Sequence, residues 1–272
     1  MKPPEPFNIA ETICRRHQDA VYRIALQDVK FAGINTYTFG GLDYLSDKFA
    51  TILYQCGIKQ NDVIATVLPQ GAAFVVAHLA ILKAGATVLP ISIKTAQTEI
   101  ENLLTVSGAK MVVVDETIYP YFNGLAKRVV QVEQIFVACD YTSRNDFGEG
   151  FRSFWYEVNF ADADFTIAPT DKTTPAYLFC QRENDGWQKH LLSHGELAES
   201  CANFSQNPAD PKAVFWTAND WSSKRVLSEM LYPAWYEGYA VAAYEMIGKN
   251  VEESLSYLDE MGLASVAVYG ET

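Results

Sequence analysis

The sequence has few of the residues that hold metal ions or build disulfide frameworks. It contains 5 cysteines and 4 histidines in 272 residues, and no two cysteines are spaced as Cys-x-x-Cys. This distribution gives no metal-ligand spacing and no disulfide framework. The N-terminal segment MKPPEPFNIAE also lacks the apolar core of a secretory signal. We therefore expect reduced thiols, no metal site and a cytoplasmic location.

Positive charge and long apolar runs are scarce as well. The 21 Lys and Arg residues stand against 33 Asp and Glu residues, which gives a net charge of −12. Non-specific nucleic-acid binding needs a basic field that displaces phosphate counterions, so this class of function is excluded. Residues 63–93 are largely apolar, but prolines and glycines divide them, whereas a membrane span needs about 20 uninterrupted apolar residues. We expect no membrane partner.

Apolar material is nevertheless sufficient for a sizeable core, because 49% of the residues are hydrophobic. In the first half, continuous apolar runs of strand length alternate with amphipathic or apolar helical segments. The expected strands are 62–68, 86–91, 110–114 and 129–137, and the expected helices include 72–84 and 97–106. Buried strands that alternate with helices are typical of parallel sheets covered on both faces. The predicted fold class is α/β, with layered, mostly parallel sheets and helices on both faces.

The second half continues this alternation with expected strands at 176–180, 213–217, 239–244 and 264–269. Residues 140–164 are polar and aromatic and are interpreted as a long surface connection. We therefore predict an N-terminal α/β sub-domain at 1–139, a connection at 140–164 and a second α/β sub-domain at 165–272.

Five segments carry a resemblance to a known family. They are TYTFGGLDYLSDKFATIL (36–53), GIKQNDVIATVLPQ (57–70), AHLAILKAGATVLPIS (77–92), SGAKMVVVDE (107–116) and FWTANDWSSKRVLSEMLYPAWYEGYAVAAYE (215–245). In order and spacing they resemble the N-terminal part of the AMP-dependent synthetase/ligase superfamily, which is adenylate-forming and acyl-CoA synthetase-like. The resemblance implies ATP or AMP and CoA as cofactors and a carboxylate as substrate. It places Asp220 and Trp221 beside the substrate pocket.

The family's phosphate loop is rich in Ser, Thr and Gly and ends in Pro-Lys just after a strand. The corresponding segment here is LFCQRENDGWQK (178–189), which keeps Gly186 and Lys189 as candidate cofactor-binding residues. Glu183 stands where the family has glycine, and a non-glycine residue at positive φ costs roughly 1–2 kcal/mol. Glu183 and Asp185 would also repel phosphate, by about 4 kcal/mol per pair of charges 4 Å apart at an effective dielectric constant near 20. The segment predicts weak nucleotide binding or none.

The family's magnesium-binding acidic residue, ribose-binding aspartate and catalytic lysine all lie further along than residue 272, so we assign no catalytic residue. The sequence predicts an incomplete family member, a pseudoenzyme unable to adenylate a carboxylate on its own. Two alternatives stay open. The chain is a non-catalytic subunit that docks on a full-length synthetase, or it is half of a split ATP-dependent acid–thiol ligase completed by a complementary chain.

Each candidate residue also has a purely structural interpretation. Lys189 is more readily explained as a solvated surface lysine, and Gly186 as a turn glycine. For Trp221, packing against the sheet and lining a pocket are equally favoured. His78 lies in a buried helix and is interpreted as a hydrogen-bonded core histidine. Ser193 is expected to cap a helix that begins at His194.

Overall fold

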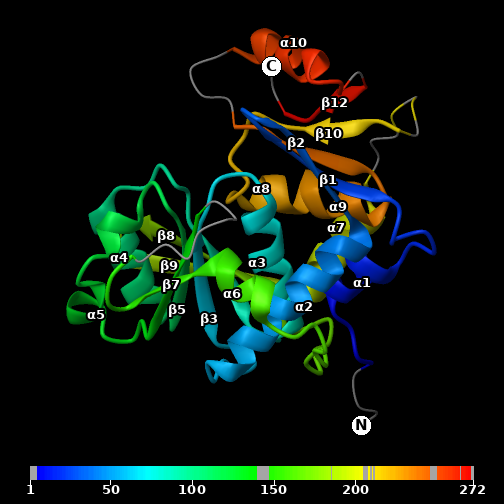
Figure 1. The fold of residues 1–272 in the computed structure, drawn as a ribbon. Coiled ribbons are helices and arrows are strands. Elements are labelled where there is room, and N and C mark those ends of the chain that lie inside the picture. Colours follow the sequence, from blue (N-terminus) through cyan, green and yellow to red (C-terminus); the bar gives the residue numbers. More distant parts are fainter. Residues whose placement is uncertain are drawn as a thin grey trace.

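The computed structural model describes residues 5–139, 147–184, 186–204, 208, 210, 212–245, 250–263 and 265–270. Within them lie two sheets (Figure 1). Sheet A has five strands in the order β12-β10-β11-β1-β2, namely β1 (Ile24–Lys30), β2 (Gly33–Thr38), β10 (Val214–Trp216), β11 (Ala240–Ala243) and β12 (Val266–Val268). Sheet B has seven strands in the order β7-β6-β5-β3-β4-β8-β9, namely β3 (Val63–Val67), β4 (Thr87–Pro90), β5 (Met111–Asp115), β6 (Gln134–Ala138), β7 (Phe151–Ser153), β8 (Pro175–Glu183) and β9 (Gly186–Ser193).

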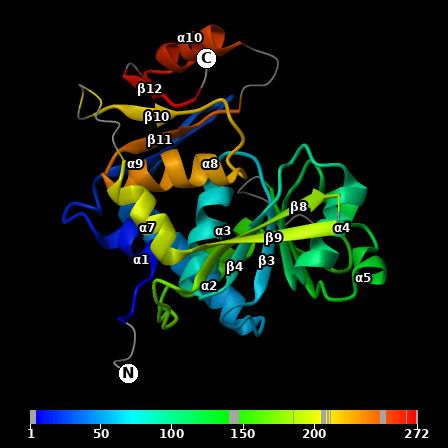
Figure 2. The ribbon, with the colours of Figure 1, turned by 180° about the vertical axis from the view of Figure 1, so that it is seen from behind.

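Helices cover both faces of each sheet, in layers that Figures 1 and 2 show from opposite sides. The central layer between the sheets contains α1 (Ile9–Arg15), α2 (Phe39–Gln55), α3 (Ala72–Lys83), α6 (Phe154–Phe160), α7 (His194–Ala202) and the continuous helical run α8 (Lys224–Val226), η2 (Leu227–Leu231) and α9 (Tyr232–Tyr236). The outer face of sheet B carries α4 (Gln97–Ser107), η1 (Tyr119–Phe122) and α5 (Leu125–Arg128), and sheet A is covered by α10 (Val251–Glu260). The predicted α/β class with mostly parallel sheets is therefore confirmed, since most strand pairs are parallel and only β1–β2 and β8–β9 are antiparallel among the described ones.

Helix starts follow the capping residues that the sequence offers. The Thr38 hydroxyl accepts a hydrogen bond from the Gly41 N–H at 3.0 Å at the start of α2. Ser193 and Glu196 form a reciprocal capping box on α7, as predicted for the helix that begins at His194. Each such cap contributes about 1 kcal/mol to the free energy of unfolding.

The prediction of a long surface connection at 140–164 is wrong for its central part. Residues 140–146 lie outside the described residues, but β7 pairs in parallel with β6, and α6 buries Phe154 and Val158. A short edge strand and a two-turn helix bury few side chains, so the polar composition concealed them. Both sheets also draw strands from the segments 1–139 and 165–272, so the predicted sub-domains do not correspond to separate sheets.

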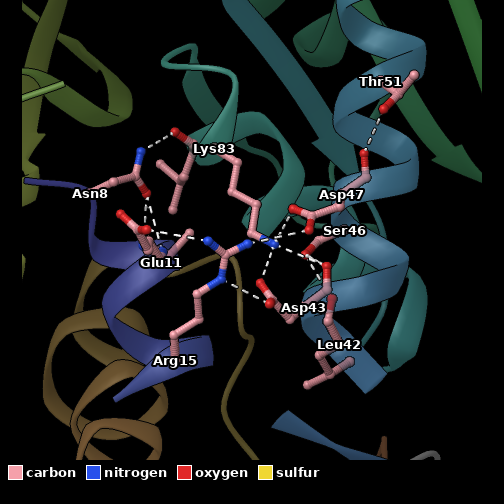
Figure 3. A network of polar contacts seen from close by, with 11 residues as sticks. Asn8, Glu11, Arg15, Leu42, Asp43, Ser46, Asp47, Thr51 and Lys83 are labelled. Atoms are coloured by element: carbon pink, nitrogen blue, oxygen red, sulfur yellow. Dashed lines mark hydrogen bonds and ion pairs between the residues drawn. The ribbon is translucent and has the colours of Figure 1, made fainter. Parts of the chain in front are cut away.

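A buried charge cluster joins the central helices (Figure 3). Lys83 at the end of α3 is completely buried, and its ammonium lies 2.6 Å from carboxylate oxygens of both Asp43 and Asp47 on α2. Arg15 of α1 adds ion pairs to the same two carboxylates at 3.0 and 3.4 Å. Burial pushes the pKa of Asp43 upward, but Lys83 and Arg15 outweigh it and hold that pKa below its ordinary value. At Asp47 burial prevails and raises the pKa.

A neutral polar chain crosses the same core. The His78 ring of α3 lies 2.8 Å from the Thr66 hydroxyl on β3 and 3.1 Å from the Tyr177 hydroxyl on β8. Tyr177 continues to the Tyr232 hydroxyl of α9 at 2.8 Å. Burial lowers the pKa of His78 to about 3, so the ring is neutral at physiological pH. The prediction of a hydrogen-bonded core histidine is confirmed.

Replacing Lys83 by methionine is expected to destabilise the fold by about 3–5 kcal/mol, because two buried carboxylates lose their main counter-charge. A second substitution, Asp47→Asn, removes one of those carboxylates and should recover part of the loss. The exposed Lys59→Met serves as the control and should change stability by less than about 0.5 kcal/mol. Urea unfolding at neutral pH measures all three. Equal effects of Lys83→Met and Lys59→Met would contradict the role assigned to the cluster.

Stability should fall as the pH is lowered from 7 toward 5.5. The folded-state pKa of His78 is depressed from 6.5 to about 3, and burial likewise depresses that of His194 to about 4. Over this interval the two histidines are protonated in the unfolded chain but not in the folded one. Each buried histidine therefore lowers the free energy of unfolding by about 1 kcal/mol between pH 7 and 5.5. His78→Gln should remove about half of the pH dependence measured by thermal unfolding, whereas the surface change His190→Gln should retain it. An unchanged slope in His78→Gln would refute this explanation.

Candidate functional site

The segment expected to form a phosphate loop is instead a β-hairpin. β8 and β9 pair in antiparallel register from Pro175 opposite Ser193 to Glu183 opposite Gly186. Only Asn184 and Asp185 remain between the strands, and Asp185 lies outside the described residues. The strand predicted at 176–180 therefore extends to Glu183, and the residues that correspond to the family's phosphate loop form paired strands (Figure 2).

This pairing determines where the backbone N–H groups of the segment point. In an antiparallel ladder, alternate residues donate to the partner strand and the others point away from it, in the plane of the sheet. N–H groups on one strand edge recur every second residue, about 6.6 Å apart. A phosphate cradle instead needs successive N–H groups that converge on one point. The paired residues of the hairpin therefore offer no convergent set of N–H groups to a triphosphate.

The structure places Gly186 and Lys189 on the exposed surface of this hairpin. Gly186 has φ +124° beside the turn, and a Cβ there would meet no atom within 4 Å. Glycine is thus required by conformation and not by close approach of another group. Lys189 lies opposite Cys180, whose pKa is raised by burial and lowered to a lesser extent by Lys189. Gly186 and Lys189 lie on the same hairpin but do not form an enclosed site with each other.

The carboxyl ends of strands from both sheets meet beside Gln70. The Gln70 amide, which follows β3, donates to the carbonyl oxygens of Thr217 and Asn219 at 3.2 and 3.1 Å. Its side-chain oxygen accepts from the Tyr244 N–H at 3.2 Å. Gln70 thereby ties the end of β3 to the ends of β10 and β11. In open α/β sheets, ligands bind at such carboxyl edges, so this region is the natural place for a site.

Both carboxylate oxygens of Asp220 accept hydrogen bonds at this junction. One carboxylate oxygen accepts from the Ser92 hydroxyl after β4, and the other accepts from the Ser222 N–H at 2.8 Å. The cavity beside Asp220 has a volume of about 20 Å³, and its wall includes Gln70, Lys94 and Glu245. That space is sufficient for about one water molecule. The substrate-binding role of Asp220 stays a prediction.

Trp221 is packed into the core, with only 1% of its surface exposed. Its ring meets Phe74 edge to face, with ring centroids 5.5 Å apart. The indole N–H is buried and has no hydrogen-bond partner within the described structure. These contacts account for the tryptophan by packing, and its predicted contact with substrate is untested.

Two larger cavities were not anticipated from the sequence. One of about 250 Å³ lies at the ends of β3, β5 and β6 and is faced by Asp28, Asp115 and Glu116. Lys30 neutralises Asp28 there at 3.0 Å. The other, of about 460 Å³, lies between β4, α4, the hairpin and Lys224 at the start of α8. Neither set of residues is contiguous in sequence, so no motif could have pointed to it.

Neither a candidate metal site nor a candidate membrane span is found among the described residues. No group of three or more His, Cys, Asp or Glu side chains there could hold a metal ion. None of the helices in the described ranges is both long and apolar enough to cross a bilayer. All five cysteines carry free thiols.

Solved structures of adenylate-forming enzymes share this fold. The anthranilate CoA ligase AuaEII, solved with anthranoyl-AMP, matches with a TM-score of 0.81 at 15% identity and covers 94% of this chain. The Brucella canis acyl-CoA synthetase matches with a TM-score of 0.82 at 19% identity over 98% of this chain. This chain spans 48% of each of these proteins. At these identities the likeness shows the fold alone.

Curated synthetase sequences also match this chain, at low identity. A nonribosomal peptide synthetase, GRA1, of Gibberella zeae is 24% identical over 207 residues, which are 75% of this chain and 2% of that protein. The mitochondrial acyl-coenzyme A synthetase ACSM3 of Mus musculus is 22% identical over 76% of this chain and 36% of its own length. The chain thus spans much less than two thirds of the relatives it matches.

A family model decides the assignment. The model described as AMP-binding enzyme matches residues 11–179, which are more than half of the chain. The matched range runs from α1 into β8 and so includes most of sheet B and the helices that cover it. The chain belongs to the AMP-binding enzyme family.

Proposed function

We propose that this chain, on its own, is a non-catalytic member of the AMP-binding family that does not capture magnesium–ATP. The observation that carries the proposal is the pairing of β8 and β9 up to Glu183 and Gly186. A strand pair disperses its N–H groups, whereas phosphate binding needs them to converge. The exposed Glu183 carboxylate beside the turn adds repulsion toward a polyanion.

The remaining roles follow from this proposal. ATP or AMP and CoA are cofactors of the family by resemblance, and binding of either to this chain is weak or absent. A small carboxylate near Asp220 and Trp221 would be held without activation. The five free thiols support a reducing, cytoplasmic setting.

Calorimetric titration with magnesium–ATP tests the proposal, in the wild-type chain and in Lys189→Ala. We expect equally weak heats from both, because the exposed Lys189 belongs to no convergent site. Pyrophosphate release with a panel of carboxylates is expected to be at background. Tight binding that Lys189→Ala weakens about tenfold or more, the value of one charge-assisted contact, would refute the proposal.

A second candidate is the complementary half of a ligase completed by another chain. The edge strand β12 favours it, because Val266 and Val268 are only half-buried and no described strand pairs with the outer edge of β12. Unpaired strand edges are templates for strands of other chains.

Co-purification from the native host, followed by identification of the bound proteins, tests this second candidate. Val266→Lys should weaken the association at least tenfold if a partner strand pairs there. The exposed Val130→Lys, in the loop before β6, is the control and should leave association unchanged. A chain that remains monomeric and without partners would exclude this role.

A further inference from the structure

The cavity of about 460 Å³ lies where sheet B is left unfinished. β4 ends at Pro90, and its register with β8 pairs Val88 with Tyr177. β8 continues to Glu183, so its last residues have no described strand on the side away from β9. The cavity occupies this gap and is lined by Leu89, Pro90, Leu103, Phe179, Cys180, Gln181, His190, Ser223 and Lys224. An open strand edge therefore forms one wall of this cavity.

The charge of this cavity is opposite to that of the whole molecule. The chain carries a net charge of −12, yet the lining includes Lys224 and no Asp or Glu. Lys224 takes no part in the ion pairs found among the described residues, and it lowers the pKa of Glu196 only as a minor effect after the Ser193 capping contacts. The 250 Å³ cavity, with Asp28, Asp115 and Glu116, shows the opposite pattern. The larger cavity therefore favours an anion.

Leu89, Leu103 and Phe179 give the wall an apolar part, beside the polar Gln181, His190 and Ser223. A phosphate group would leave the apolar part of this lining unused, whereas a carboxylate on an apolar body meets both Lys224 and the apolar side chains. The open edge of β8 adds a third feature, because strand edges pair with extended peptides. A small acid would leave that edge unused. An extended peptide that ends in an apolar residue uses the edge, the apolar wall and the lysine together.

We propose that this cavity binds the C-terminus of a partner polypeptide. The partner's last residues extend β4 beside Cys180 and Gln181, its terminal side chain packs against Leu103, and its carboxylate pairs with Lys224. The inference rests on the same paired hairpin as the proposed function. The experiment on the peptide site contains no nucleotide. Tight ATP binding would therefore refute the proposed function but not the peptide site.

Fluorescence anisotropy with a labelled short peptide tests the proposal. The peptide alternates threonine and valine and ends in leucine with a free carboxylate. The same peptide with an amidated C-terminus should bind about tenfold more weakly, because it loses a charge-assisted contact. Lys224→Gln should abolish the difference between the two peptides. Leu103→Trp should fill the cavity and weaken both. Lys94→Gln, an exposed lysine outside this cavity, is the matched control and should behave as wild type.

Thermal unfolding of each variant establishes that it is folded. Equal affinity for the acid and the amide would overturn the proposal, as would failure of the folded wild-type chain to bind either. Competition by sodium octanoate tests the remaining alternative, in which the cavity binds a small acid. Octanoate that binds through Lys224 while neither peptide does would assign the cavity to a small acid and overturn the peptide site.

Discussion

Antiparallel pairing between β8 and β9 is the constraint on which the candidate site depends. The ladder runs to Glu183 and Gly186, so the chain reverses within two residues. A wider loop could have turned successive N–H groups toward one point, but strand pairing sends them in alternate directions. The same extension carries β8 beyond the end of β4 and leaves the cavity beside Leu103 and Lys224. In our proposal, this one strand pairing both disperses the N–H groups that would bind phosphate and leaves a cavity that favours an anion.

Two buried polar networks connect this hairpin to the central helices and stabilise them. Tyr177 anchors the buried part of β8 through the hydrogen-bonded chain to His78 and Tyr232. The Lys83 cluster fixes α1 and α2 against α3, the helix that carries His78. Both networks are internal and contain no site for a ligand. The fold that these networks hold together is shared with solved structures at TM-scores near 0.8 and identities below 20%.

Much of this fold could be predicted because its strands are buried on both faces. The run at residues 62–68 is continuous and apolar, as a central parallel strand requires, and Thr38 marks the start of α2. The extension of β8 could not be recognised, because Gln181, Arg182 and Glu183 are exposed and show no apolar alternation. Their strand conformation comes from pairing with distant residues. β7 and α6 were missed for a similar reason. Trp221 was ambiguous because a pocket wall and a core favour the same side chain.

Amide hydrogen exchange along the hairpin tests the central claim most directly. Paired strands protect their ladder amides, whereas a phosphate-binding loop exchanges freely until its ligand orders it. We predict alternating protection from Cys180 to Lys189 in the free protein, unchanged by saturating concentrations of magnesium–ATP. Rapid exchange throughout this segment that slows when magnesium–ATP is added would contradict the account.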